Sequence, residues 1–361
     1  MRIMDPTLLL VLIAIPYAFF GAVILLNARN LKSNKDYGYK PTVTVYLPTF
    51  NEEKHIAGKL DNLLAQTYPI KEILIFDCSS DHTVQIIEEY QKLSASIKLI
   101  KQSQRIGMAR TLNVALKVAG GDIFVKTDCD SVSEPSALQE LVANFTDERI
   151  GGATGICVAD KGTEKYFRKF MTAIQVAESN IDSTLIAHSA SLVAFRASVA
   201  EPVKENSVAD DTEEFLLIRK KGYRTVIDPN VISREEVPSN NMVRRAQKNR
   251  RSQGIVKVLM DNFQMLMNPK YNNYGTLVLP IEWFILIFSP ILLIALVGVL
   301  GYALYLVHPF LVVAMAVIIV AALIQRSNVL WTIIETEMSG LVGLARSIFR
   351  GNSDGIWEKL R

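Results

Sequence analysis

Two long runs without charged side chains set the strongest limit on how this chain of 361 residues folds. The first run covers residues 7–26, and the second covers residues 277–324 with Glu282 as its only charged residue. A helix that crosses a bilayer needs about 20 apolar residues. The first run therefore predicts one transmembrane anchor, and the second predicts a hairpin of two helices that turns near His308 and Pro309.

Basic residues beside these runs predict how the chain is oriented. Arg29 and Lys32 follow the first run, whereas Lys270 and Arg326 flank the second. Because Lys and Arg near span ends stay in the cytoplasm, we expect the N-terminus outside and the central domain inside the cell. The alternative for the first run is a cleaved signal peptide, but its apolar core is longer than is usual for one, and the basic residues follow it. The chain has only three cysteines, which fits a reducing compartment better than a disulfide framework.

Strand and helix patterns alternate between the anchor and residue 127. Short runs rich in β-branched residues occur at 42–47, 72–76, 97–101 and 123–127, with helical patterns between them. This alternation predicts an α/β domain with a mostly parallel sheet, covered by helices on both faces. Ligands of such sheets bind beyond the carboxyl ends of the strands. Polar clusters follow three of the runs, at residues 48–52, 77–81 and 128–130.

The last of these clusters is a pair of aspartates separated by one residue. In an extended chain Asp128 and Asp130 point the same way, while Cys129 points into the protein. Two carboxylates are too few to enclose Mg²⁺ or Mn²⁺, which complete their shells with water and substrate phosphates. The alternative is a solvated acidic turn. A dinucleotide enzyme or a Walker A protein is disfavoured, since neither glycine-rich motif follows the first strand.

In order and spacing, these clusters resemble family 2 glycosyltransferases of the GT-A fold. The resemblance rests on residues 48–53 (PTFNEE), 77–81 (DCSSD) and 128–130 (DCD). Residues 209–212 (ADDT) look like the acidic catalytic pair of the family. Residues 247–251 (QKNRR) look like the Q-x-x-R-W motif of its cellulose-synthase-like members, with Arg251 where tryptophan is usual.

The resemblance implies a role for each matching residue. Asp211 would be the catalytic base, and Asp130 together with Asp128 would bind Mn²⁺ or Mg²⁺. Asp210, His188 and Ser189 are candidates for the acceptor side. The nucleotide sugar would contact Pro48, Thr49, Glu52, Asp77, Arg105, Asp128, Asp130, Gln247, Arg250 and Arg251. Two groups of these residues also have a non-catalytic explanation. Aspartates at the start of a helix cap it well, and arginines of a basic segment bind anionic lipid.

We expect five segments along the chain. They are an anchor at 1–28, a cytoplasmic GT-A domain at 40–240, a basic interfacial segment at 241–275, a transmembrane hairpin at 277–326, and an amphipathic interfacial helix with a tail at 327–361. Residues 166–176 mix apolar and basic side chains and are interpreted as a further interfacial helix. Within the basic segment, Arg244 and Arg245 are expected to face lipid headgroups, whereas Gln247 and Arg250 are expected to face the site.

The expected function is membrane-bound, inverting transfer of a hexose from a nucleotide sugar, either GDP-mannose or UDP-glucose. Three spans do not enclose a polymer channel, which favours a lipid-linked acceptor at the cytoplasmic leaflet: a polyprenyl phosphate, a lipid-linked oligosaccharide or a glycolipid. The protein is expected in the cell membrane, with no nucleic-acid partner. Three alternatives stay open: an inactive nucleotide-binding scaffold, a processive polysaccharide synthase, and a hydrolase of phosphorylated substrates, which lacks a nucleophile motif.

Overall fold

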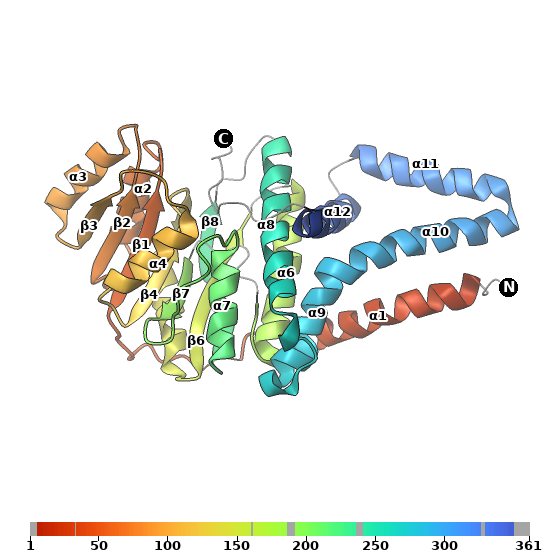
Figure 1. The fold of residues 1–361 in the computed structure, drawn as a ribbon, viewed down its shortest axis with the longest axis horizontal. Helices are drawn as coiled ribbons and strands as arrows, with labels where there is room; N and C mark the ends of the chain where they lie inside the picture. The colour runs from red at the N-terminus through yellow and green to blue at the C-terminus, as the bar shows by residue number, and fades with distance from the viewer. Residues whose placement is uncertain are drawn as a thin grey trace.

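The protein consists of an α/β domain from which apolar helices project to one side (Figure 1). The structure is a computed structural model. It describes residues 6–32, 34–159, 162–185, 192–235, 241–325 and 329–349.

An eight-stranded sheet with the order β3-β2-β1-β4-β7-β6-β8-β5 forms the centre of the domain. Its strands are β1 (Val43–Thr49), β2 (Glu72–Asp77), β3 (Ile97–Lys101), β4 (Ile123–Thr127), β5 (Ser131–Ser133), β6 (Ile150–Val158), β7 (Leu192–Arg196) and β8 (Arg224–Glu235). The parallel arrangement predicted for the first four strands is confirmed. Beyond β4 the sheet is mixed, because β7 runs antiparallel to both β4 and β6, and β5 runs antiparallel to β8. These strands pair with distant segments, so local sequence patterns do not reveal their direction.

Helices cover both faces of the sheet, as predicted. One face carries α2 (Ile56–Leu64), α3 (Thr83–Leu93) and α5 (Ala137–Ala143), and the other carries α4 (Met108–Val118) and α7 (Asp210–Lys220). Successive side chains of a strand point to opposite faces. In β4, Val125 accordingly packs in the α2 cluster and Phe124 in the α4 cluster. Lys126 and Thr127 continue this alternation into the site.

The remaining helices lie at the base of the domain or project from it (Figure 1). They are α1 (Pro6–Asn27), α6 (Gly162–Ile181), α8 (Asn241–Asp261), α9 (Leu279–Trp283), α10 (Ser289–Val307), α11 (Pro309–Gln325) and α12 (Val329–Phe349). Short 3₁₀ turns are η1 (Asn144–Thr146), η2 (Phe263–Met265) and η3 (Pro269–Tyr271), and short π-helical turns are η4 (Tyr274–Val278) and η5 (Phe284–Phe288).

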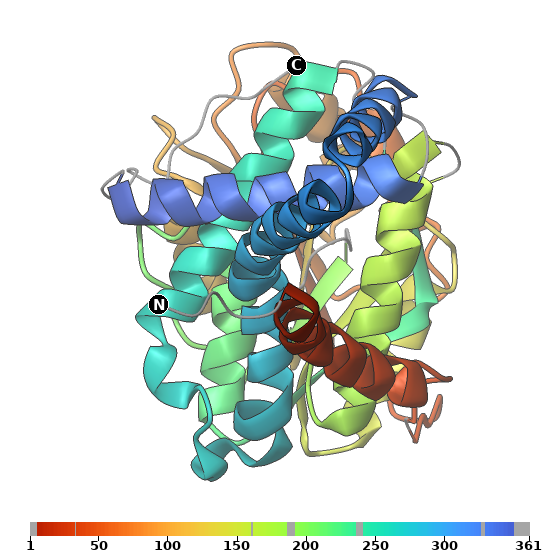
Figure 2. The same cartoon turned by 90° about the vertical axis from the view of Figure 1, so that its right-hand side faces the viewer.

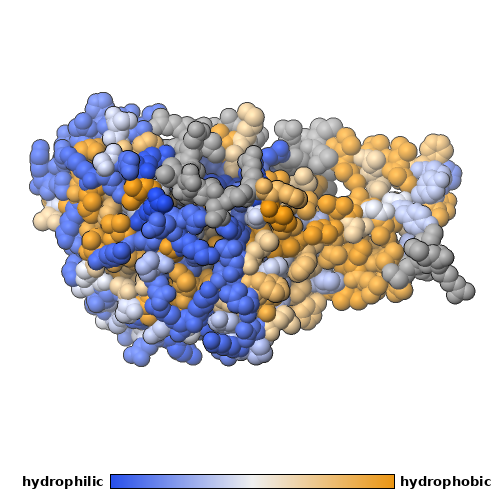
Figure 3. All heavy atoms as spheres, in the orientation of Figure 1, coloured by the Kyte–Doolittle hydropathy of each residue, from blue (hydrophilic) through white to orange (hydrophobic). Residues whose placement is uncertain are grey.

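The projecting helices α1, α10 and α11 expose apolar side chains along most of their length (Figure 3). Among the described residues, Pro6–Asn27 and the helical run Tyr274–Val307 are long and apolar enough to cross a membrane, whereas Pro309–Ala321 is apolar but shorter. An apolar surface of this extent needs a non-aqueous environment or a partner. The structure thus supports two of the three predicted spans, with the turn between α10 and α11 at His308 as expected.

The apolar block that was predicted to form the hairpin divides into two parts. Its first part is not available to lipid, because Val278 and Leu279 pack in a buried cluster with Met171 of α6 and Ile255 of α8. The exposed hairpin therefore begins later than residue 277, at α10. The same cluster corrects the interpretation of α6, which is mainly a core helix that leaves Phe170 exposed. An apolar pattern is equally compatible with a protein core and with lipid.

Helix α12 crosses the base of the domain, next to α8 and α6 (Figure 2). The approach of α12 to α8 is so close that a Cβ atom at Gly343 would lie 2.5 Å from Ser252 Oγ. Only glycine permits this spacing. Helix α12 therefore lies between the domain and the root of the projecting hairpin.

Candidate functional site

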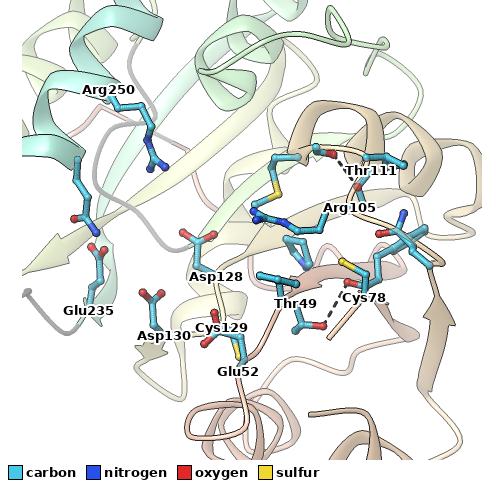
Figure 4. A pocket seen from close by; sticks show the side chains of 18 of the residues that line it. Thr49, Glu52, Cys78, Arg105, Thr111, Asp128, Cys129, Asp130, Glu235 and Arg250 are labelled. Carbon is cyan, nitrogen blue, oxygen red and sulfur yellow. Dashed lines mark hydrogen bonds between the residues drawn. The ribbon is translucent and has the colours of Figure 1, made fainter. Parts of the chain in front are cut away.

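A cavity of 260 Å³ opens at the carboxyl ends of β1 and β4 (Figure 4). It brings together every residue predicted to contact the nucleotide sugar except Asp77. Its lining includes Pro48, Thr49, Glu52, Arg105, Asp128, Asp130, Gln247, Arg250 and Arg251. The predicted acceptor-side residues His188 and Ser189 lie outside the described part of the chain.

Asp77 lies behind the wall of this cavity and organises the turn after β2. Its side chain is buried and accepts hydrogen bonds from Thr49 Oγ1 (2.6 Å) and from the Ser79 amide and hydroxyl (2.7 Å each). Asn51 adopts a left-handed conformation (φ 54°), and its side chain accepts a hydrogen bond from the Ser80 amide. These contacts fix the first two strand ends against each other. Asp77 therefore holds Thr49 in place rather than facing the cavity itself.

Carboxylates gather on one side of the cavity. Asp128 and Asp130 are joined there by Glu52 and by Glu235, the last residue of β8 (Figure 4). Burial raises the pKa of Asp128 to about 6, and the neighbouring Asp130 and Glu235 add to this, while Lys126 opposes it. Burial, followed by Glu235 and Glu52, also raises the pKa of Asp130. Glu235 was not predicted, although an acidic residue at the end of a β-branched run was a usable signal.

This acidic side fits a divalent cation that shares its coordination with a ligand. Hard carboxylate oxygens are suitable donors for Mn²⁺ or Mg²⁺. Within the described ranges, however, no three His, Cys, Asp or Glu side chains converge closely enough to hold a metal by themselves. Asp128 and Asp130 would hold the ion, and phosphate oxygens would supply further ligands.

Beneath the acidic turn lies a buried lysine that sequence reasoning missed. Lys59 of α2 is 1% exposed, and its ammonium donates to Thr127 Oγ1 (2.7 Å), the Ser131 carbonyl (3.0 Å) and Ser131 Oγ (3.1 Å). Burial lowers its pKa to about 8, while Asp128 opposes this shift. The lysine thus ties both ends of the 128–130 turn to α2. A lysine within a helical pattern usually indicates a solvent face, so nothing local marked it.

A second buried lysine, on the opposite face of β4, contacts the predicted catalytic pair. The Lys126 ammonium donates to Asp210 and, at 2.5 Å, to Asp211 Oδ1. Both acids are in the first turn of α7, where the helix dipole also favours negative charge. The side chain of Asp211 is 29% exposed and that of Asp210 only 8%, so Asp211 is the more accessible carboxylate. Burial raises the pKa of Asp211 to about 7, and the Lys126 cation opposes this shift.

Arginines line the cavity beside the carboxylates. Arg250 reaches in from α8, and burial together with the neighbouring Arg251 lowers its pKa to about 10 (Figure 4). Arg251 lies 3.6 Å from Glu235, and Arg105 stacks on the Phe50 ring at 4.2 Å. Arginine forks suit phosphate oxygens. The cavity thus offers cations for a diphosphate and carboxylates for a bridging metal ion.

The basic segment around these arginines is tied to α12 by ion pairs. Lys248 contacts Glu335 at 3.0 Å and Glu164 at 3.2 Å, and Arg244 lies 3.6 Å from Glu335. The expectation that Arg244 faces lipid headgroups is therefore wrong. Its side chain is 18% exposed and neutralises a buried carboxylate of α12.

Comparisons with known proteins agree with this geometry. Residues 44–221 match the profile described as "Glycosyl transferase family 2". Hyaluronan synthase of Streptococcus pyogenes is 32% identical over 152 residues, which is 37% of this chain and 35% of that protein. Poly(ribitol-phosphate) beta-N-acetylglucosaminyltransferase TarS of Staphylococcus aureus is 35% identical over 109 residues, or 29% of this chain and 19% of that protein. These matches thus span about a third or less of the curated relatives.

One solved structure matches almost the entire chain. It is a mannosyltransferase, PcManGT, from Pyrobaculum calidifontis, in complex with GDP-Man and Mn²⁺. It shares 25% sequence identity and a TM-score of 0.77 over 94% of this chain and 99% of the other. The likeness therefore includes the projecting helices as well as the sheet.

Proposed function

Since the domain at residues 44–221 belongs to glycosyl transferase family 2, we propose that the protein transfers a hexose from a nucleotide sugar to a lipid-linked acceptor, with inversion. One observation carries the proposal. A single cavity brings together a carboxylate pair and an arginine pair, and the accessible carboxylate of Asp211 lies outside its lining but near enough for the charge of Asp128 to act on it. Asp128 and Asp130 bind the cation, and Arg250 with Arg251 binds the diphosphate.

In this mechanism the chain orients the donor and removes one proton. A bound divalent cation supplies charge neutralisation for the departing nucleoside diphosphate. Asp211 takes the proton from the acceptor hydroxyl as the new bond forms. The ammonium of Lys126 contacts Asp211 and favours its ionised form. The same ammonium also contacts Asp210.

The donor and metal are proposed as GDP-mannose with Mn²⁺, with UDP-glucose and Mg²⁺ as the second choices. Support comes from the mannosyltransferase of Pyrobaculum calidifontis, which was solved with GDP-Man and Mn²⁺. The need for a base also bears on the acceptor. A hydroxyl must lose a proton during transfer, whereas the oxygen of a polyprenyl phosphate is already ionised. This difference favours a lipid-linked glycan or a glycolipid among the three acceptor classes.

We further propose a multi-pass protein of the cell membrane. Helices α1 and α10 cross the bilayer, and α11 returns as the third span, so that the catalytic domain faces the cytoplasm. We keep the anchor at 1–28 and the catalytic domain at 40–240 as predicted, whereas α8 of the segment 241–275 packs into the base of the domain, and the hairpin is formed by α10 and α11.

A processive synthase is the second candidate, favoured by the likeness to hyaluronan synthase. The two functions differ in product length. A single-sugar transferase yields a lipid product with one added hexose, whereas a synthase yields a ladder of products.

The test uses the full chain in detergent with Mn²⁺, labelled GDP-mannose or UDP-glucose, and lipid extract. We expect the label in the lipid fraction, on products that have gained one hexose by mass spectrometry. Nucleotide binding without any transfer to lipid would contradict the proposal and support an inactive scaffold instead.

A further inference from the structure

A groove with apolar walls lies where the projecting helices leave the domain (Figure 1). Its walls come from three parts of the chain: α1, the turn that follows η2, and the run from α9 to the first turn of α10. Each described residue that lines it has an apolar side chain. In the described part of the chain, the groove and the donor cavity have no lining residue in common. The groove is therefore a separate site.

Aromatic rings pack along the groove and fix its walls. Phe284 of η5 is 6% exposed and packs on Phe20 of α1, with 4.8 Å between the ring centroids. Trp283 lies between Phe263 and Phe288, at centroid distances of 5.6 and 6.2 Å. Because these contacts are made by the protein itself, the groove does not need a ligand to form.

The turn at one edge of the groove has a strained backbone. Met267 adopts a left-handed conformation (φ 56°), which is uncommon for a residue with a side chain, and its side chain is 65% exposed. The Met267 amide donates to the Gly275 carbonyl (2.9 Å), and a Cβ atom at Gly275 would lie 2.4 Å from the Asn268 carbonyl oxygen. Close packing against η4 thus retains a strained turn that presents an exposed apolar side chain at the groove. Strain of this kind is typical of positions that hold a ligand.

The volume and the walls of the groove indicate the class of ligand. The volume is 420 Å³, compared with 260 Å³ for the donor cavity. A water molecule occupies about 30 Å³ of the liquid and a methylene group is of similar size, so the groove has room for a hydrocarbon chain of about ten carbons. A sugar of the same volume would lose its hydrogen bonds to water and find almost none on the described walls, which is unfavourable.

The surroundings of the groove indicate a membrane lipid as the source of the chain. Phe288 and Ile291 line the groove and also belong to the apolar surface of the projecting helices, since they are 47% and 49% exposed (Figure 3). Trp283 lies in the groove, and Lys270 and Tyr271 follow its turn on η3. Trp and Tyr are enriched where a membrane meets water, and Lys is enriched on the cytoplasmic side. The groove is thus continuous with the proposed lipid-facing surface, at the level of the cytoplasmic leaflet.

We propose that this groove binds one hydrocarbon chain of a membrane lipid, which lies across Trp283 and Phe284 between α1 and α10. The lipid is a structural ligand that fills the joint between the catalytic domain and the spanning helices. The inference rests on the membrane placement given under the proposed function, and it goes beyond the transfer reaction because the site is separate from the donor cavity. A ligand that binds only the folded protein also raises its stability.

Tryptophan fluorescence tests whether a lipid occupies the groove. The chain has three tryptophans, Trp283, Trp331 and Trp357, so Trp331→Phe with Trp357→Phe leaves Trp283 as the only one. The probe is phosphatidylcholine with bromine atoms on its acyl chains, which quench a tryptophan that they contact. It is added to the full-length protein in maltoside detergent. We expect quenching of Trp283 that saturates at one lipid per protein chain.

Phe19→Trp is the matched control on the adjacent position of α1. Phe19 contacts Phe20 and is 54% exposed, but it lies outside the groove. In a protein whose three tryptophans are replaced by Phe, Phe19→Trp should be quenched in proportion to the lipid content of the micelle, without saturation. The same unsaturated dependence at Trp283 would overturn the proposal, because it would show only the general lipid around apolar helices.

Two asparagine variants one turn apart on α10 test the walls. Ile291 lines the groove, whereas Ile294 is 61% exposed and lies outside it. Because an amide is unfavourable against hydrocarbon, we expect Ile291→Asn to weaken lipid binding at Trp283 by about 10-fold and to lose the rise in unfolding temperature caused by the lipid. Ile294→Asn should match the parent protein, and equal lipid binding in the two variants would overturn the proposal. Nucleotide-dependent thermal stabilisation checks the fold of both. If Ile291→Asn fails that check, Ile291→Ala replaces it and should weaken binding by about 5-fold through lost apolar contact.

The outcomes separate this inference from the proposed function. Saturable quenching of Trp283 in a protein that transfers no sugar would support the lipid site and overturn the transferase. Sugar transfer with unsaturated quenching would overturn the lipid site while the transferase stands. Quenching that disappears as the protein concentration rises, together with a doubled mass by light scattering, would overturn the lipid site in favour of a second copy of this chain in the groove.

Discussion

The two acidic pairs of the site have different counter-charges. Asp210 and Asp211 share the ammonium of Lys126, which contacts both carboxylates. Asp128 and Asp130 face the cavity together with Glu235, and their pKa values rise because burial and neighbouring carboxylates disfavour the charged forms. One ammonium of the chain therefore partly neutralises the first pair, whereas the second pair concentrates negative charge at the place where a substrate arrives.

This difference assigns a task to each pair. A base must stay ionised and accessible without help from the donor. At Asp211 the Lys126 cation favours the ionised form. A metal-binding pair, in contrast, gains most from a cation when no side chain already neutralises it. The two buried lysines on opposite faces of β4 keep these tasks apart: Lys126 pairs with α7, and Lys59 supports the turn that carries Asp128 and Asp130.

The largest effect is expected for Asp211→Asn. Asparagine keeps the size of the side chain and an oxygen that accepts from Lys126 but does not take up the proton, so turnover should fall by about 10²-fold or more. Nucleotide binding with Mn²⁺ should stay near the wild-type value. Steady-state transfer assays and nucleotide-dependent thermal shifts measure these two quantities. Asp210→Asn is the matched control, and a larger loss there than in Asp211→Asn would reverse the assignment.

Lys126→Met should give an intermediate effect by removing the shared cation. The Lys126 cation favours ionised Asp211, so its loss should move the pKa of Asp211 above its value of about 7. The kcat against pH profile, which rises through this pKa, should move to higher pH by about one unit, with a roughly 5-fold loss at pH 7 that is recovered at higher pH.

Lys59→Met is the control for this profile, since Lys59 contacts Thr127 and Ser131 rather than the catalytic pair. It should weaken metal-dependent nucleotide binding and leave the inflection in place. An unchanged inflection in Lys126→Met would contradict the claim that Lys126 favours the ionised form of Asp211.

Glu214→Gln should give the smallest effect and extends the comparison to a carboxyl without a paired cation. Glu214 of α7 is fully buried, and its Oε1 accepts a hydrogen bond from the Glu201 amide. Burial raises its pKa from 4.5 to about 8. The folded state then binds a proton that the unfolded state releases, so wild-type stability falls as pH rises from 4.5 to 8.

The substitution should remove this slope, which is at most about 1.4 kcal/mol per pH unit. Thermal unfolding of both proteins between pH 5 and 8 measures it. Glu214→Gln should become progressively more stable than the wild type as pH rises, and parallel curves would show that Glu214 is ionised in the folded protein.

Sequence patterns predicted the first four strands and the acidic pair because these features are local. Alternating β-branched runs specify β1 to β4, and parallel strands bring their polar ends to one edge. The wall of the cavity formed by Arg250 was predictable only through resemblance to a family. Local patterns did not place Lys126 or Lys59, because a charged residue in a strand or helix is normally solvent-exposed. Each lysine is buried by partners more than 60 residues away in sequence.

The apolar block at residues 277–324 shows a second limit of sequence patterns. Lipid and protein cores select the same side chains, so hydrophobicity did not reveal where the domain ends. Glu282 was the local signal, since a carboxyl is costly in hydrocarbon. In the structure it is buried against the base of the domain, and the exposed apolar surface begins after it.

Calorimetric titration of GDP into the wild type, Asp130→Ala and Asp211→Asn, each with Mn²⁺ and with EDTA, tests the division between the two acidic pairs most directly. We expect Mn²⁺ to strengthen GDP binding at least 10-fold in the wild type and in Asp211→Asn. This gain should be lost in Asp130→Ala. Binding that does not depend on Mn²⁺, or an equal loss of the gain in Asp211→Asn and Asp130→Ala, would contradict it.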